Sequence, residues 1–314
     1  MKRTRGAVLS TLVAGLLWGS SFAVIKVGLR SIDPYWFVFL RFLMASLIAL
    51  AISALTGRLT RVLPLLRDPV VIWLGVSNAA GFVFQFKGQT MTTAANAALL
   101  INIATIFVAI ASRFVFRERF GTIKLLSVAL GMAGVFLVTT GGHLQATPGA
   151  SIGGDLMILA AAFLWTFFIV LDKHLVGRHE VDVRALTTAM VVVTGVASLP
   201  VALVFGRGGF PGLTGQWWTI PYTAVFCTVV PFFLWTSGLR YITATTSSVI
   251  MLTEVVFALG LATVLLGESL SPVAIVGSVL ILAGVALVSR DKGEAAPIGP
   301  DVVPEEPLAP ASEH

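Results

Sequence analysis

Residues 35–55 read YWFVFLRFLMASLIALAISAL, an apolar run in which Arg41 carries the only charge. A helix rises about 1.5 Å per residue, so a run of this length crosses a hydrocarbon core of about 30 Å. Backbone amides find no water partner in lipid, and a helix satisfies them within one segment. We therefore predict that this run is a transmembrane helix.

Nine further runs of similar length and composition occur along the chain. Of its 314 residues, 57% are apolar and only 11% are charged, whereas soluble domains carry about 25% charged residues. These features predict an all-α membrane protein, multi-pass in the inner (plasma) membrane. The first run is interpreted as a retained helix and not as a cleaved signal, because many spans follow it. The ten predicted spans are 7–29, 35–55, 70–90, 95–116, 122–140, 153–173, 184–205, 219–239, 244–266 and 272–290.

Basic residues are unevenly distributed over the connections between these spans. Most of the 21 Lys and Arg residues fall on alternate connections, beginning with Lys2, Arg3 and Arg5. By the positive-inside rule, both termini are predicted to be cytoplasmic. Residues 291–314, rich in Pro, Ala and Glu, are predicted to form a disordered cytoplasmic tail. The net charge of +6 then reflects membrane orientation, and no nucleic-acid partner is expected.

The chain also repeats itself at a nearly constant offset. Leu17-Trp18 matches Leu164-Trp165, and further matching pairs recur up to the last helix of each half. We predict two repeats of five helices each, residues 1–142 and residues 143–290. Because five is an odd number, the two repeats enter the membrane in opposite senses. Inverted repeats of this kind are typical of secondary transporters.

Three short motifs resemble a known family. The segment Leu17-Trp18-Gly19-Ser20-Ser21-Phe22 resembles the opening of EamA-domain proteins in the drug/metabolite transporter superfamily, and Arg41-Phe42 resembles their second-span pair. Leu266-Gly267-Glu268 resembles the end of their ninth span. The likeness covers residues 7–290. It implies ten helices around a central cavity and transport of metabolites or drugs, often outward.

Two positions depart from the family pattern. Members usually carry a proline in the middle of the fourth and ninth spans, where this chain has Thr105 and Val255. A proline kink is therefore not expected in either helix.

Glu254 is the most informative single residue. It lies near the centre of the ninth predicted span, where a charged side chain costs about 3 kcal/mol on insertion scales. It is a candidate to carry a proton coupled to substrate movement, or to pair with a cationic substrate. The alternative is a neutral, hydrogen-bonded carboxyl that fixes helix packing. The matching residue of the first repeat is Ala104.

Two basic residues are candidates for binding an anionic group. Arg41 lies about two turns inside the second span, where it would attract a carboxylate if it faces a cavity. The alternatives are an arginine that extends its charge to the membrane surface or one that pairs with an acid such as Asp33. Lys87 lies nearer the end of the third span, where its charge reaches water more easily.

Aromatic and small polar residues complete the predicted site. Trp18 and Trp165 lie in the middle of their spans, where they would either stack on a planar or apolar substrate or fill space between helices. The predicted substrate-binding residues are Trp18, Ser21, Arg41, Lys87, Asn102, Trp165, Trp235, Thr253 and Glu254.

Several activities lack their sequence signatures. The chain has no Gly-x-x-x-x-Gly-Lys-Ser/Thr phosphate loop and no nucleophilic serine elbow. Its four histidines lack metal-site spacing, and Cys227 is its only cysteine. We therefore expect no enzyme, no cofactor and no bound metal.

These observations favour a secondary active transporter that exports small organic metabolites such as amino acids. Alternating access around a central cavity is the expected mechanism, with Glu254 as the candidate for proton coupling. The alternatives are efflux of drugs or lipophilic cations, a facilitator that uses no protons, and a non-transporting assembly or sensor protein. The expected partners are a small solute, the lipid bilayer and protons, and a monomer is favoured.

Overall fold

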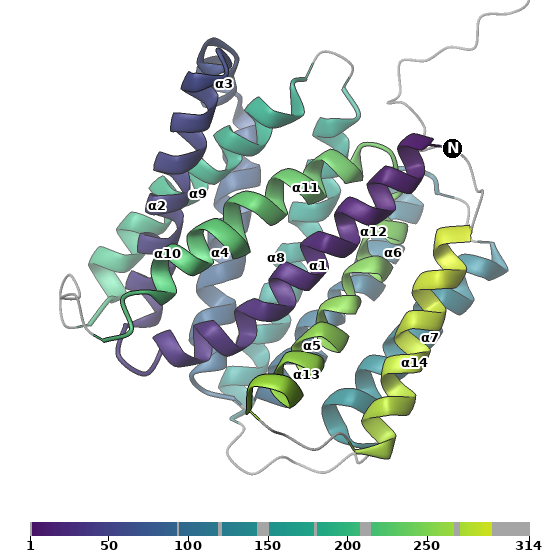
Figure 1. Cartoon of the computed structure of the whole chain (residues 1–314). Coiled ribbons are helices and arrows are strands. Elements are labelled where there is room, and N and C mark those ends of the chain that lie inside the picture. The colour runs from purple at the N-terminus through teal and green to yellow at the C-terminus, as the bar shows by residue number, and fades with distance from the viewer. Residues whose placement is uncertain are drawn as a thin grey trace, which may run out of the picture.

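The computed structural model describes residues 2–92, 94–118, 121–142, 151–178, 181–207, 215–266 and 271–290, and these are almost entirely helical (Figure 1). Within them, ten helical segments are long and apolar enough to cross a membrane, which confirms the predicted number of spans. The tail predicted to be disordered lies outside the described residues.

The helices follow one another with short connections. In chain order they are α1 (Lys2–Gly28), α2 (Pro34–Leu55), α3 (Leu59–Leu65), α4 (Pro69–Gln89), α5 (Ala94–Asn102), α6 (Ala104–Val115), α7 (Thr122–Thr140), α8 (Ile152–Val176), α9 (Val183–Phe205), α10 (Thr219–Ala224), α11 (Val230–Leu239), α12 (Ala244–Met251), α13 (Thr253–Leu266) and α14 (Pro272–Arg290). A π-helical turn, Val225–Val229, joins α10 to α11, so these three segments form one span.

Asp-Pro pairs begin two of the membrane helices. Asp33 accepts a hydrogen bond from the backbone N–H of Tyr35 at 2.9 Å, and Asp68 accepts one from Val70 at 2.8 Å. The proline that follows each aspartate suits the first helical turn, because it has no N–H to leave unpaired there. Asp33 is therefore a helix cap, and it is not the partner of Arg41 that the sequence allowed.

Helices that are distant in sequence lie side by side in the bundle. α1 runs along α11 and α13, α2 packs on α9, and α4 packs on α8 and α9 (Figure 1). α7 and α14 pack on each other at one edge of the molecule (Figure 1). Within the described residues, no wall residue of the central cavity discussed below belongs to α7 or α14, so this pair supports the bundle from outside.

The fourth and ninth spans are both interrupted near their middle, although neither has a proline there. α5 ends at Asn102 and α12 ends at Met251. The next residue of each span, Ile103 or Leu252, donates its N–H to the carbonyl three residues earlier, at 3.2 Å in both cases. Such a tightened turn breaks the regular ladder of hydrogen bonds. The lack of a proline therefore does not make these helices continuous.

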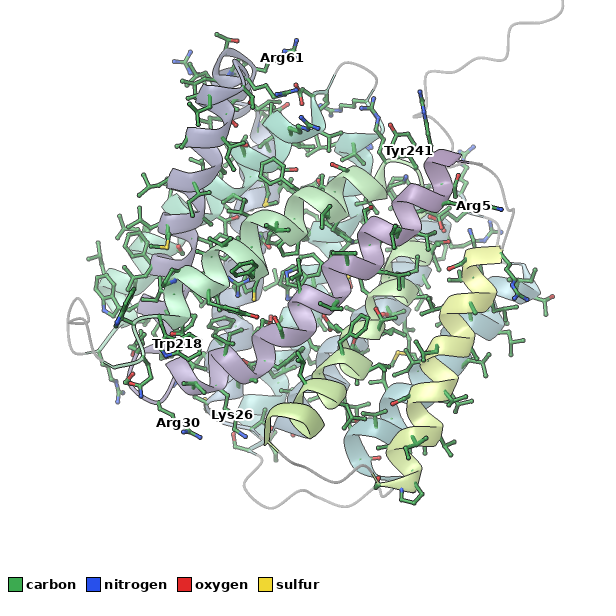
Figure 2. All side chains as sticks on the ribbon, viewed as in Figure 1. Arg5, Lys26, Arg30, Arg61, Trp218 and Tyr241 are labelled. Carbon is green, nitrogen blue, oxygen red and sulfur yellow. The ribbon has the colours of Figure 1, made fainter. Side chains whose placement is uncertain are left out.

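Basic side chains lie at both ends of the bundle. Figure 2 shows Arg5, Arg61 and Tyr241 at one end, and Lys26, Arg30 and Trp218 at the opposite end. The charge pattern of the sequence assigns Arg5 and Arg61 to the cytoplasmic side and Lys26 and Arg30 to the other side. The two groups therefore lie at opposite ends, as that pattern requires.

Glycines allow α7 and α14 to approach closely. A Cβ placed on Gly277 would come 2.7 Å from the carbonyl oxygen of Gly134, and one on Gly284 would come 2.8 Å from that of Ser127. Backbone atoms cannot give way as a flexible side chain can. Stripes of small residues are a common way for membrane helices to pack when the hydrophobic effect is absent.

We predict that Gly277→Ala destabilises the protein by about 1–3 kcal/mol, because the added methyl group must push two helix backbones apart. Gly260→Ala is the matched control, since it lies in α13 with no atom within 4 Å of its added Cβ. Alanine favours a helix, so this control should be neutral or stabilising. Thermal unfolding in detergent measures both, and equal melting temperatures for the two variants would contradict the close packing.

Candidate functional site

A cavity of about 130 Å³ lies at the centre of the bundle. Its walls come from α1, α2, α4, α5, α6, α8, α11, α12 and α13. The structure brings seven residues of the predicted set to this cavity: Trp18, Ser21, Arg41, Asn102, Trp165, Trp235 and Glu254.

The two other residues of the predicted set lie elsewhere. Lys87 borders a separate apolar hollow beside Tyr35 and Phe205. Thr253 is buried, and its hydroxyl donates to the carbonyl of Ile250 at 2.7 Å. The same hydroxyl lies against Gly15 of α1, so Thr253 contributes to helix packing.

Arg41 is held in the wall of the cavity, and no acidic side chain among the described residues pairs with it. Its side chain is 1% exposed, and its Nε donates a hydrogen bond to the Thr228 hydroxyl at 2.6 Å. One terminal nitrogen, Nη2, donates to the carbonyl oxygen of Cys227 at 2.5 Å. The guanidinium carbon lies 4.6 Å from the centre of the Phe82 ring, within cation–π range. The other terminal nitrogen, Nη1, has no hydrogen-bond partner among the described residues.

Pro231 explains why a backbone carbonyl is available to Arg41. In an α-helix the carbonyl of Cys227 would accept the N–H of residue 231, but proline has none. The helix widens into the π-helical turn at this point. The freed carbonyl accepts a second hydrogen bond, from the indole Nε1 of Trp18 at 3.0 Å. One main-chain oxygen thus joins α1, α2 and the eighth span.

Glu254 follows the interruption of the ninth span at Leu252. It is partly buried, lines the cavity, and occupies the first turn of α13. The interruption at Leu252 therefore places the carboxyl near a helix N-terminus, where a negative charge is stabilised by about 0.3–1 kcal/mol. The side chain of Asn102, at the end of α5, interacts with this carboxyl. Both interrupted spans therefore present polar side chains to the cavity.

Aromatic rings form the apolar part of the wall. Trp235 stacks on Phe168 with ring centres 5.7 Å apart, and its Nε1 donates to Ser247 at 2.9 Å. Trp18 meets Trp235 edge-to-face at 6.0 Å. Trp165 contacts Phe168 at 5.5 Å, and its buried Nε1 has no hydrogen-bond partner among the described residues. The cavity therefore offers flat apolar surfaces and one unused indole donor.

A buried charged cluster lies outside the predicted site, at the end of α8. Lys173 donates hydrogen bonds to the carbonyls of Leu239 and Ile242, both at 2.8 Å. It thereby satisfies the last carbonyl of α11, that of Leu239, and through Ile242 holds the connection to α12. Asp172 is 1% exposed and accepts a hydrogen bond from Thr236 at 3.2 Å.

Glu118 completes this cluster from the other side of α12. Its carboxylate accepts hydrogen bonds from the Thr245 hydroxyl at 2.8 Å and from the backbone N–H of Ala244 at 3.2 Å. Lys124 forms a buried ion pair with it at 3.3 Å. Glu118 therefore caps the start of α12. This cluster was not predicted from the sequence. The feature that could have indicated it is Asp172, an acid inside a predicted span next to Lys173.

Comparison with known proteins identifies the family. A model of the EamA-like transporter family matches residues 5–140 and 152–290, and so matches the chain twice. An "Uncharacterized transporter" of Archaeoglobus fulgidus is 28% identical over 283 residues, covering 87% of this chain and 94% of that protein. The "Uncharacterized transporter YetK" of Bacillus subtilis is 28% identical over 310 residues, covering 95% and 91%.

Two further comparisons agree with this family. The "Uncharacterized inner membrane transporter YedA" of Escherichia coli K12 is 25% identical over 281 residues, covering 88% of each chain. A solved crystal structure superimposes with a TM-score of 0.75 at 19% identity, covering 90% of this chain and 95% of that one, and it shows the same fold. The chain is a multi-pass membrane protein and belongs to the EamA-like transporter family.

Proposed function

We propose that this chain is a secondary transporter that exports a small amphipathic metabolite of the amino-acid type across the inner membrane. The observation that carries the proposal is the central cavity, where a guanidinium nitrogen with no hydrogen-bond partner in the described part of the chain shares one aromatic-walled space with a carboxyl. The Arg41 guanidinium would bind a carboxylate, and Glu254 would bind an ammonium group. The apolar part of the solute would rest on the rings of Trp18, Trp165 and Trp235.

The size of the cavity supports a small solute. An apolar cavity of about 150 Å³ holds one benzene molecule. The space of about 130 Å³ therefore accommodates a compact solute in the conformation described here. A larger drug would require the helices to separate first.

Alternating access is supported by how the helices pair. Numbering the spans in order, the second packs on the seventh and the fifth on the tenth. The third packs on the sixth, and the first on the eighth. If each span is replaced by its equivalent in the other half, five spans away, the second–seventh and fifth–tenth contacts stay the same. The third–sixth contact becomes the first–eighth contact, and the reverse. Two inverted repeats, residues 1–142 and 143–290, would give this pattern and would allow their conformations to interchange.

The buried cluster around Lys173 acts in this proposal as a lock at the cytoplasmic end. Lys173 and Glu118 tie α8, α12 and the connection between α11 and α12 to one another. This end is the one that Arg61 and Tyr241 mark (Figure 2). Opening the cavity to the cytoplasm requires these hydrogen bonds to be replaced by water.

The carboxylate of the solute is tested by comparing two ligands. A free amino acid with an apolar side chain should raise the melting temperature of the purified protein. Its methyl ester should bind about ten- to a hundredfold more weakly, because losing a charged hydrogen bond costs about 1.5–3 kcal/mol. Arg41→Gln should abolish the difference between acid and ester, and Lys87→Gln, outside the cavity, should keep it. Equal binding of acid and ester to the wild-type protein would exclude carboxylate recognition and favour lipophilic cations.

Proton coupling is tested at Glu254. In proteoliposomes with an imposed pH gradient, the wild-type protein should accumulate substrate. Glu254→Gln should still exchange substrate down its own gradient but lose accumulation, because no carboxyl remains to carry a proton. Glu254→Asp, which keeps a titratable group, should restore part of it. Full pH-driven accumulation by Glu254→Gln would remove this role and leave a facilitator or another coupling residue.

The lock is tested by labelling from the cytoplasmic side. In a Cys227→Ala background, Ser248→Cys places one thiol in the cavity wall. In inside-out vesicles, Lys173→Met should increase the reaction of this thiol with a membrane-impermeant maleimide. The carbonyls of Leu239 and Ile242 lose their donor, so the cytoplasmic end should open more often. Lys26→Met, an exposed lysine at the other end, is the matched control. Unchanged labelling in Lys173→Met would show that the cluster does not close this end.

A further inference from the structure

One hydrogen-bond donor in the wall of the central cavity is not used by the described part of the chain. The wall includes Trp18, Trp165 and Trp235, and two of these indoles donate to the protein. Trp18 donates to the carbonyl of Cys227 at 3.0 Å, and Trp235 donates to the hydroxyl of Ser247 at 2.9 Å. The buried Nε1 of Trp165 has no hydrogen-bond partner among the described residues. An unpaired buried donor is costly, so its presence calls for an explanation.

The proposed repeat explains why Trp165 lacks the acceptor that Trp18 has. Trp18 matches Trp165 at an offset of 147 residues, and Pro231 matches Gly81 at an offset of 150. Trp18 can use the carbonyl of Cys227 because Pro231 has no N–H to occupy it. Gly81 has an N–H, so the same exchange of partners does not arise in the first half of the chain.

The carbonyl that corresponds to that of Cys227 is already occupied in α4. This helix runs without interruption, so the N–H of Gly81 donates to the carbonyl of Ser77, which matches Cys227 in the repeat. A Cβ placed on Gly81 would lie 3.5 Å from the Nε1 of Trp165, so the indole lies against this stretch of α4. Its N–H is therefore left available for a ligand.

Helix packing supports the register of this comparison. A Cβ placed on Gly88 of α4 would come 3.1 Å from the carbonyl oxygen of Gly154 in α8. A Cβ placed on Gly238 of α11 would come 3.0 Å from the carbonyl oxygen of Ala7 in α1. Gly88 and Gly238 are 150 residues apart, and Ala7 and Gly154 are 147 apart. The two contacts therefore follow the same offsets as the tryptophans and their acceptors.

Trp165 and Arg41 lie against the same aromatic ring. The guanidinium carbon of Arg41 lies 4.6 Å from the centre of the Phe82 ring, and the Trp165 ring centre lies 4.8 Å from it. The Nη1 of Arg41 is also a buried donor with no partner among the described residues. A compact solute whose carboxylate binds Arg41 can therefore present a second oxygen to Trp165. An indole N–H is a neutral donor, so this second oxygen need carry no charge.

We propose that Trp165 determines specificity by donating a hydrogen bond to an uncharged oxygen in the side chain of the transported solute. This inference rests on the proposed function and narrows the solute to an amino-acid-type metabolite with a hydroxyl, ether or carbonyl oxygen. A solute with an apolar side chain still binds through its charged groups, but it leaves the indole N–H unpaired. Sites built to hydrogen-bond a substrate group discriminate against analogues that lack the group for this reason.

The experiment compares two solutes that differ at one position. O-methyl-L-serine and L-norvaline have side chains of equal length, and an ether oxygen of the first replaces a methylene group of the second. Isothermal titration calorimetry measures both affinities on the full-length protein in detergent. The wild-type protein should bind O-methyl-L-serine about tenfold more tightly. Trp165→Phe keeps an aromatic ring but removes the N–H, so it should bind the two solutes about equally.

Two further variants separate the indole N–H from the shape of the wall. Gly81→Ala should fold, because alanine favours a helix and the nearest contact of its added Cβ is 3.5 Å. Its methyl group lies beside the Nε1 of Trp165 and should reduce the preference for O-methyl-L-serine. Trp235→Phe is the matched control, since it removes an indole N–H that is bonded to Ser247. It should keep the preference, even if it weakens the binding of both solutes.

The outcomes distinguish this inference from the function on which it rests. Equal binding of the two solutes to the wild-type protein would overturn the role of Trp165 and leave the carboxylate site of the proposed function intact. A loss of preference in Trp235→Phe as large as that in Trp165→Phe would indicate an effect of wall shape and would also overturn it. Failure of both solutes to bind the wild-type protein would overturn the proposed transport of amino-acid-type solutes, and this inference with it.

Discussion

The interaction on which the site depends is the pair of hydrogen bonds at the carbonyl of Cys227. Within a membrane an unpaired backbone carbonyl costs several kcal/mol, on the order of a lost hydrogen bond or more. Pro231 removes the ordinary donor, and Arg41 and Trp18 replace it. The same hydrogen bonds also satisfy the guanidinium, because a buried guanidinium needs acceptors for its N–H groups. A carboxylate partner would cancel its charge, whereas a carbonyl and the Thr228 hydroxyl leave the positive charge available to a ligand.

The polar cluster at the end of α8 follows a different rule. Lys173 binds the carbonyl of Leu239 and Glu118 binds the N–H of Ala244, two groups at helix ends that have no partners within their own helices. Water can satisfy these groups almost as well as a side chain can. The proposed lock, because it is built on helix ends, would therefore open with little net loss of hydrogen bonds. The buried bonds of Arg41 have no such substitute, which suits a fixed wall and not a moving one.

A feature could be predicted from the sequence only where it depends on the type of a particular side chain. The spans follow from hydropathy, and Trp18 and Glu254 could be placed in the cavity because each is unusual at mid-span. The helix interruption at Leu252 could not be predicted, because no proline in the sequence indicates it. One of the two hydrogen-bond partners of Arg41 is a main-chain oxygen, which any residue at position 227 would supply. Only Pro231, four residues later, indicates that this carbonyl is free.

The proposed repeat divides the residues of the site into two kinds: those with an equivalent residue in the other repeat and those without one. Trp18 and Trp165 occupy matching positions in the sequence, so the aromatic walls would be kept in the proposed exchange of conformations between the halves. Glu254 has no counterpart, since Ala104 stands in its place. In the proposed mechanism, a symmetric apolar surface would contact the solute in both states, while charged residues without a counterpart in the other repeat would set the orientation in which the solute binds. A zwitterion uses both charges, and it therefore suits this combination better than a simple cation, which would leave the Arg41 guanidinium without an anion.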